Sequence, residues 1–249
     1  MIVCKSQSEI EKMRRASMIV HDILEDLRQA VKPGMSTSEL DAIAERKTRE
    51  SGARPAFKGY RGYPKSLCTS INQEVVHGIP SERRVLKEGD IIGLDYGVIV
   101  EGYFGDAAIT VPVGTVNGSL KKLLQVTEES LELGIAQVRP GHRISDIGSA
   151  VQQHAEASGF SVVREFCGHG IGTALHEDPQ IPNYGTPGHG PILKEGMVLA
   201  LEPMINEGTF QVKILEDQWT AVTVDGRNSA HFEHTVAVTH NGPWVLSRP

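Results

Sequence analysis

Two segments 107 residues apart repeat one pattern, and this repeat constrains the fold more than any other feature of the chain. Residues 87–95, KEGDIIGLD, correspond to residues 194–202, KEGMVLALE. In each copy a Lys-Glu-Gly turn precedes a short apolar strand that ends in a carboxylate. A carboxylate at the end of a buried strand is unfavourable unless a positive charge faces it. We therefore expect Asp95 and Glu202 to approach one shared cation.

The same offset relates two pairs of predicted helices. Apolar residues at helical spacing predict helices over 8–31 and 36–51 in the first half, each opened by a Ser-x-x-Glu capping box, the first of them Ser8–Glu11. The corresponding pair in the second half covers 120–138 and 145–158. Pro-Gly or Gly ends each of these runs, as expected at helix termini.

One constant offset thus joins helices and strands, which predicts an internally duplicated chain with halves of about 1–115 and 116–249. Each half has the order helix, helix, strands, His-x-x-Pro, turn and carboxylate strand. Helices followed by strands are typical of an α+β fold. We expect one catalytic domain over 1–249, with its site where the two halves meet on a common sheet.

The composition is typical of a soluble globular protein. Of 249 residues, 39% are hydrophobic and 22% charged, and the net charge of −6 argues against a nucleic-acid-binding surface. The three cysteines are widely spaced, as in proteins of a reducing compartment. No segment approaches the ~20 apolar residues of a membrane span, and the N-terminus lacks a signal-peptide pattern. We therefore expect a cytoplasmic protein without membrane or nucleic-acid contacts.

A predicted β-hairpin brings two acids together in the first half. Residues 91–100 and 103–109 form the two strands, with a Glu-Gly turn between them. Asp95 lies on the first strand and Asp106 on the second. Either acid alone is also compatible with a turn or a bulge. Two acids on facing apolar strands repel each other without a cation, so the pair predicts a metal ion.

The second half contributes three further candidate ligands. Glu202 ends the repeated strand, Glu233 lies in the strand-like run 231–238, and His169 is flanked by glycines in CGHGIG. Glycines allow a ligand or substrate to approach a tight loop closely. An isolated histidine is usually structural, and we assign that role to six others: His21, His142, His154, His189, His234 and His240.

Four carboxylates and one imidazole carry too much negative charge for one divalent ion. They suit two ions about 3.5–4 Å apart with at least one bridging acid. Oxygen-rich ligation without thiolates favours Mn, Fe, Co or Zn in a catalytic site. Such a pair activates a hydroxide and polarises a carbonyl, which predicts a hydrolase. His77 and His176 then hydrogen-bond a substrate carbonyl and stabilise the tetrahedral intermediate, or else serve as structural residues at strand ends.

With these residues in view, the whole chain resembles the type I methionine aminopeptidases of the pita-bread metallopeptidase family. The resemblance implies a pita-bread fold, in which helices pack on a curved, mainly antiparallel sheet. The motifs that carry it are GYRGYPKS at 59–66, IN with VHGIP at 71–80, CGHGIG at 167–172, LEPM at 201–204 and FEHT at 232–235.

The resemblance implies two divalent ions, with Asp106 and Glu233 bridging them. The implied ligands are Asp95, Asp106, His169, Glu202 and Glu233. His77 and His176 become substrate-contacting catalytic histidines, and Glu202 becomes the proton shuttle.

The resemblance also implies a pocket for the methionine side chain, because aromatic and sulfur groups suit a polarizable thioether. Its lining consists of Tyr60, Tyr63, Cys68 and Trp219. Phe57 and Leu175 depart from the pattern of well-known members, which often have Cys and Phe there, and they redistribute bulk along the pocket wall. Asn72 and Ser229 match positions that hold a structural monovalent cation in some members.

The implied reaction is removal of the N-terminal methionine from peptides and nascent proteins, preferentially when the second residue is small. We expect a monomer that associates transiently with the ribosome. Only 30 residues separate Glu202 from Glu233, which leaves no room for the helical insertion of type II enzymes. One alternative is a proline-specific or creatine-cleaving relative, although these normally carry a large additional N-terminal domain. The other is a non-catalytic binding module, although no metal ligand is missing.

Overall fold

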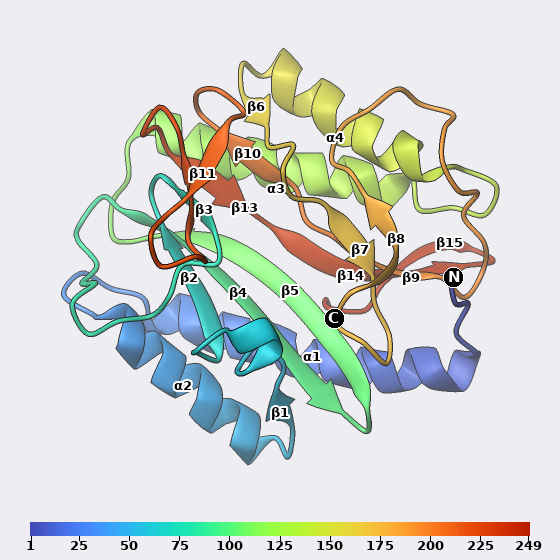
Figure 1. The fold of residues 1–249 in the computed structure, drawn as a ribbon, viewed down its shortest axis with the longest axis horizontal. Coiled ribbons are helices and arrows are strands. Elements are labelled where there is room, and N and C mark those ends of the chain that lie inside the picture. The colour runs from blue at the N-terminus through green and yellow to red at the C-terminus, as the bar shows by residue number, and fades with distance from the viewer.

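Helices cover one side of a curved antiparallel sheet in this computed structural model, which describes residues 1–249 (Figure 1). The helices are α1 (Gln7–Ala30), α2 (Thr37–Glu50), α3 (Gly118–Ala136), α4 (Ile144–Ala157) and the short 3₁₀ turn η1 (Tyr60–Gly62). No helix is long and apolar enough to cross a membrane.

The main sheet has nine strands in the order β1-β4-β5-β14-β9-β7-β8, with β2 also on β4 and β15 also on β14. Its members are β1 (Arg54–Pro55), β2 (Leu67–Ile71), β4 (Ile91–Val100), β5 (Tyr103–Pro112), β7 (Gly168–Gly170), β8 (Glu177–Ile181), β9 (Val198–Leu201), β14 (Glu233–Thr239) and β15 (Gly242–Val245).

Two small sheets flank the main one, in the orders β13-β10-β6 and β11-β12-β3. Their strands are β3 (Glu74–Val76), β6 (Ser161–Val162), β10 (Met204–Asn206), β11 (Val212–Ile214), β12 (Ala221–Thr223) and β13 (Ser229–His231). The α+β class and the pita-bread arrangement are therefore as predicted.

The predicted capping box of the first helix was wrong by two residues. The Ser6 backbone N–H donates to Glu9 Oε2 at 2.8 Å, so Ser6 and Glu9 form the box and α1 begins at Gln7. Lys5 N–H donates to the Gly196 carbonyl at 2.7 Å, which holds the preceding backbone extended and fixes where the helix starts. The second box was correct, since Ser36 N–H donates to Glu39 Oε2 at 2.7 Å.

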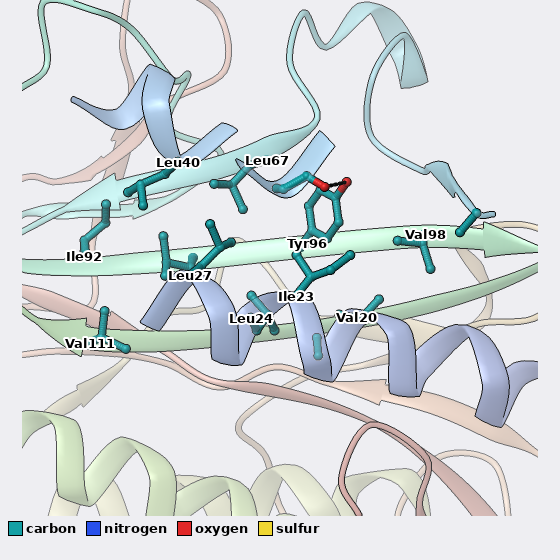
Figure 2. Close-up of a cluster of buried hydrophobic side chains, with 14 of the residues drawn as sticks. Val20, Ile23, Leu24, Leu27, Leu40, Leu67, Ile92, Tyr96, Val98 and Val111 are labelled. Atoms are coloured by element: carbon teal, nitrogen blue, oxygen red, sulfur yellow. Dashed lines mark hydrogen bonds between the residues drawn. The ribbon is translucent and has the colours of Figure 1, made fainter. Parts of the chain in front are cut away.

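Helix α1 packs on one face of β4 and leaves the opposite face of the hairpin uncovered by helices. Figure 2 shows Val20, Ile23 and Leu27 of α1 packed against β4 residues that include Ile92 and Tyr96. Burying each large apolar side chain stabilises the fold by about 1.5–3 kcal/mol. Because side chains alternate along a strand, the residues between these face away from the helices. Asp95 therefore points to the opposite, concave face.

The first repeated strand does not end at its carboxylate, as the repeat alone suggested, but covers 91–100 as the predicted hairpin requires. Asp95 lies in the middle of β4, which continues to Val100 and pairs with β5 along its whole length. In the second copy Glu202 does follow the end of β9 directly. Pro203 comes next and has no N–H to extend a ladder, whereas the first copy has no such interruption. The predicted hairpin itself is confirmed.

The two halves share the main sheet at the junction of β5 and β14. Only two residue pairs form it, Glu233 with Ala108 and His234 with Ala107. Strands of the first half lie on one side of this junction and strands of the second half on the other (Figure 1). The junction places acids from both halves next to each other.

Candidate active site

A cavity opens on the concave face of the sheet, beside the β5–β14 junction. All the metal-ligand, catalytic and pocket residues expected from the sequence line it, together with Arg61, which was not expected. The lining residues are Phe57, Tyr60, Arg61, Tyr63, Cys68, His77, Asp95, Asp106, His169, Leu175, His176, Glu202, Trp219 and Glu233.

Strand register brings the acids together. Ala108 on β5 pairs with Asp95 on one side and with Glu233 on the other, so these two acids flank one strand. Asp106 lies two residues before Ala108 and shares its face. Three of the expected ligands, Asp106, His169 and Glu233, offer ligand atoms that all lie within 4.8 Å of one another.

Glu202 extends this group from its other side. Its Oε1 lies 3.5 Å from His169 Nε2, and Asp106 Oδ2 lies 3.9 Å from the same nitrogen. Asp95 and Glu202 stand outside the tightest set of three and adjoin it. The five expected ligands thus occupy one side of the cavity.

The chemistry of this group fits a cation. Three buried oxygens have no hydrogen-bond partner: Asp95 Oδ1, Asp106 Oδ1 and Glu233 Oε1. A buried charged oxygen without a partner is strongly unfavourable. Burial, followed by repulsion between the acids, raises the pKa of Asp106 and Glu233, and burial raises that of Asp95 to about 7. Divalent ions would satisfy the orphaned oxygens and restore their charge.

A hydrogen bond to the backbone of the next residue fixes which ring nitrogen of His169 is free to bind a metal. Its Nδ1 lies 2.9 Å from the Gly170 carbonyl, which can only accept, so Nδ1 carries the proton. The lone pair is then on Nε2, which faces the carboxylates. Burial, with a smaller effect of His176, lowers the pKa of His169 to about 4 and keeps the ring neutral. Metal-binding histidines commonly have such a partner on the second nitrogen.

His77 and His176 face the same cavity from different halves. His77 follows β3 in the left-handed region at φ 62° and packs edge-on against Phe166 and Trp219. His176 precedes β8, and its Nδ1 lies 2.8 Å from the Tyr60 hydroxyl. Its ring centroid lies 4.2 Å from that of His169. Burial is the main cause that lowers the pKa of both His77 and His176.

The remaining lining residues form an apolar wall. Tyr63 packs edge-on against Trp219 at 5.1 Å, and its hydroxyl donates to the carbonyls of Leu67 and Gly78. The polar end of Tyr63 is therefore turned into the protein, and its ring faces the cavity. Cys68 and Leu175 are buried beside it. This wall suits an apolar, polarizable side chain.

Two residues of the site were missed in the sequence. Arg61 lines the cavity with its guanidinium 5.4 Å from the Tyr60 ring centre, and only the glycines around it hinted at a special turn. His231 is buried, and its unpartnered Nε2 lies 3.9 Å from Glu202 Oε2. Side-chain alternation along 231–233 places His231 on the face of Glu233, a signal that was available.

Comparison with known proteins agrees with this geometry. The profile of metallopeptidase family M24 matches residues 11–240. The chain is 55% identical over 248 residues to methionine aminopeptidase 1 of Bacillus subtilis (strain 168), with 100% of each chain covered. The crystal structure of methionine aminopeptidase from Thermotoga maritima superposes with a TM-score of 0.99 at 46% identity, again covering both chains fully.

Prolidases share the fold more distantly. The structure of prolidase from Pyrococcus furiosus has a TM-score of 0.78 and 23% identity, and the match covers 99% of this chain and 66% of that chain. At this identity the likeness shows the fold alone.

Proposed function

The chain belongs to metallopeptidase family M24, and we propose that it acts as a metal-dependent methionine aminopeptidase. The single observation that carries this is the convergence of five ligand-type residues, two histidines and an apolar wall in one cavity. Identity above one half along the whole chain to a methionine aminopeptidase supports the same conclusion. Peptides with an N-terminal methionine are the substrates.

We further propose that the site holds two divalent ions. Asp95, Asp106, His169, Glu202 and Glu233 would hold them, with Asp106 and Glu233 shared. The three orphaned carboxylate oxygens and the unprotonated Nε2 of His169 support this assignment. Such ions lower the pKa of a water molecule and polarise a carbonyl. Their ligand types admit Co, Mn, Fe or Zn.

The protein residues around the ions position the peptide and move the proton. His77 and His176 would contact the scissile peptide group and stabilise negative charge on its oxygen. Glu202 would take a proton from the attacking water and deliver it to the leaving amine nitrogen. Its place beside His169, at 3.5 Å, and next to the open cavity supports that role.

The apolar wall would receive the methionine side chain. Tyr60, Tyr63, Cys68 and Trp219 present aromatic faces and sulfur to the thioether. Phe57 and Leu175, both buried, complete the wall and set its depth. We propose that a small second residue is preferred.

We also propose three further properties from the resemblance to the family. They are a single duplicated domain, a cytoplasmic monomer and transient contact with the ribosome. A structural monovalent cation would lie near Asn72 and Ser229, where Ser229 N–H donates to the Asn72 carbonyl at 2.9 Å and Asn72 has φ 55°.

The direct test uses the full chain reconstituted with each of the four metals in turn. We expect release of methionine from Met-Ala-Ser and no release of the first residue from Xaa-Pro peptides. The reverse result would favour a proline-specific relative. Cleavage of neither substrate with any metal, while Asp106→Asn preserves the biological role, would favour a binding module.

A further inference from the structure

Two neighbouring histidines of the cavity have chemically different partners. His169 Nδ1 meets a backbone carbonyl, which only accepts a hydrogen bond, so its proton is on Nδ1. His176 Nδ1 meets the Tyr60 hydroxyl at 2.8 Å, and a hydroxyl, unlike a carbonyl, can donate as well as accept. A neutral imidazole carries one proton, and the nitrogen that carries it depends on the partner of the other nitrogen.

We propose that Tyr60 is a positioning residue that sets the tautomer of His176. The Tyr60 hydroxyl donates to Nδ1, so the single ring proton stays on Nε2. There it can donate to the carbonyl oxygen of the bound peptide and to the oxyanion that forms from it. This role rests on the proposed function and adds a residue that acts through His176. The opposite tautomer would turn a lone pair toward that oxygen and repel it.

The backbone around Tyr60 is built to hold its side chain in place. Gly59, Arg61 and Gly62 all have left-handed φ angles, of 85°, 48° and 91°. The left-handed conformation is unfavourable for Arg61 and persists only where the surroundings impose it. Tyr60 N–H donates to the Phe57 carbonyl, and the Tyr60 carbonyl accepts from Tyr63 N–H, both at 2.9 Å.

The segment that carries His176 is also held by an ion pair and a hydrogen bond. The next residue, Glu177, forms an ion pair with Lys5 at 2.7 Å, and both side chains are largely buried. The second oxygen of Glu177 accepts from Ala174 N–H at 3.1 Å. Both partners of the Tyr60–His176 hydrogen bond are therefore anchored by separate contacts.

His77 provides an internal contrast. Its ring contacts Phe166 and Trp219 through aromatic edges, and no protein group hydrogen-bonds to either ring nitrogen. His176 Nδ1 therefore has a protein partner that can hold one tautomer, whereas the proton position of His77 is left to the substrate. The two His-x-x-Pro histidines are not equivalent donors.

The test reads the tautomer directly. In full-length, zinc-loaded protein labelled with ¹⁵N-histidine, two-bond ¹H–¹⁵N correlations show which ring nitrogen is protonated, and His176→Asn identifies the signals. We expect the wild-type His176 proton on Nε2. In Tyr60→Phe we expect a mixture of tautomers, with kcat for Met-Ala-Ser lower by about tenfold and KM changed less than about twofold, because the ring remains in the pocket.

Tyr103→Phe is the matched control. It removes a hydroxyl that donates to Glu9 at 2.8 Å outside the cavity, so the tautomer and both kinetic constants should stay as in the wild type. A proton on Nδ1 of wild-type His176, or an unchanged tautomer and kcat in Tyr60→Phe, would overturn the proposal. If no variant, wild type included, cleaves methionyl peptides, the proposed function fails while the tautomer is still decided by the spectra.

Discussion

In the first half, α1 and α2 lead into a long hairpin whose two strands pair from Ile91 with Pro112 to Val100 with Tyr103. In the second half, α3 and α4 lead into the four-residue strand β9, which pairs with β14 rather than with a hairpin partner. The common frame brings Asp95 and Glu202 to one cavity. The first half contributes two acids within its long hairpin. The second half contributes the His169 imidazole and two acids, Glu202 directly after β9 and Glu233 at the start of β14.

The two halves differ in how firmly the backbone holds their acids. Asp95 lies mid-strand and is paired with Cys68 on one side and Ala108 on the other, and Asp106 lies mid-strand opposite Gly97 while its carbonyl accepts from the Thr235 hydroxyl at 2.7 Å. Glu202 follows the end of β9 and precedes Pro203, so its side chain is the less constrained. A rigid acid suits a metal ligand, and a freer one suits a proton carrier. The following predictions test this division.

The largest expected effect comes from removing ligands in either half. Asp95→Ala, Glu202→Ala and His169→Ala should each lower kcat by at least ~10³-fold, because each removes one of the proposed ligands of the ions. Steady-state cleavage of Met-Ala-Ser, with metal content measured on the same samples, checks this. Glu101→Gln is the control, an exposed acid at the turn of the same hairpin as Asp95. Near-normal activity in any ligand variant would refute the site.

The second prediction distinguishes the two histidines proposed to contact the substrate from the proposed metal ligands. His77→Ala and His176→Ala should each lower kcat by about 10²-fold while both ions stay bound, since each loses a donor to the developing oxyanion. Metal content by elemental mass spectrometry is the deciding measurement. An ion lost from His176→Ala would make His176 a ligand instead.

A smaller effect concerns stability without metal, and its sign is unusual. Burial and repulsion raise the pKa of Asp106, so its charged form destabilises the metal-free fold. At pH 8 the neutral Asp106→Asn should therefore be more stable than wild type by roughly 1–3 kcal/mol. As the pH falls to 5 the wild-type acids take up protons, and the advantage should shrink.

Urea unfolding of chelator-treated protein at the two pH values measures this difference, and Glu233→Gln tests the same effect from the second half. With metal restored, both variants should be less stable than wild type. A metal-free Asp106→Asn that is destabilised at pH 8 would show that the acids do not repel one another as argued.

The smallest effect comes from exposed ion pairs, one in each half. Arg15 pairs with Glu101 at 2.8 Å and Arg248 with Glu132 at 2.6 Å, and all four side chains are well exposed. Arg15→Ala and Glu132→Ala should each change the free energy of unfolding by less than about 1 kcal/mol. Urea titration checks this. A larger loss from one variant alone would reveal a stabilising role confined to that half.

Local patterns were sufficient to predict the helices, the hairpin and the acids. These predictions used signals within a few residues. They were apolar spacing for α1 and α3, turn residues around an apolar run for β4, and glycines around His169. The error at Ser8 arose because two Ser-x-x-Glu patterns overlap, and a distant contact of Lys5 with Gly196 selects the earlier one. Local rules carry no information about such a contact.

Local signals existed for the two missed residues, in the alternation along 231–233 and in the glycines around Arg61, but the contacts that were missed are long-range. The β5–β14 junction rests on two residue pairs between distant segments, so neither its register nor the contact of His231 with Glu202 follows from periodicity. The tautomer of His176 likewise depends on a tyrosine 116 positions earlier in the chain. The lining of the cavity was predicted through family motifs, and the hydrogen bonds within it required the structure.

The β5–β14 junction has a consequence for the order of events during synthesis on the ribosome. The first half emerges with Asp95 and Asp106 but with neither His169 nor Glu233, so it has two mutually repelling acids and an incomplete set of ligands. With the ligand set proposed above, Asp106 meets His169 and Glu233 only after β14 has docked on β5, so the group that would hold the ions is completed last. A nascent enzyme of this design stays inert until nearly all of it has been translated.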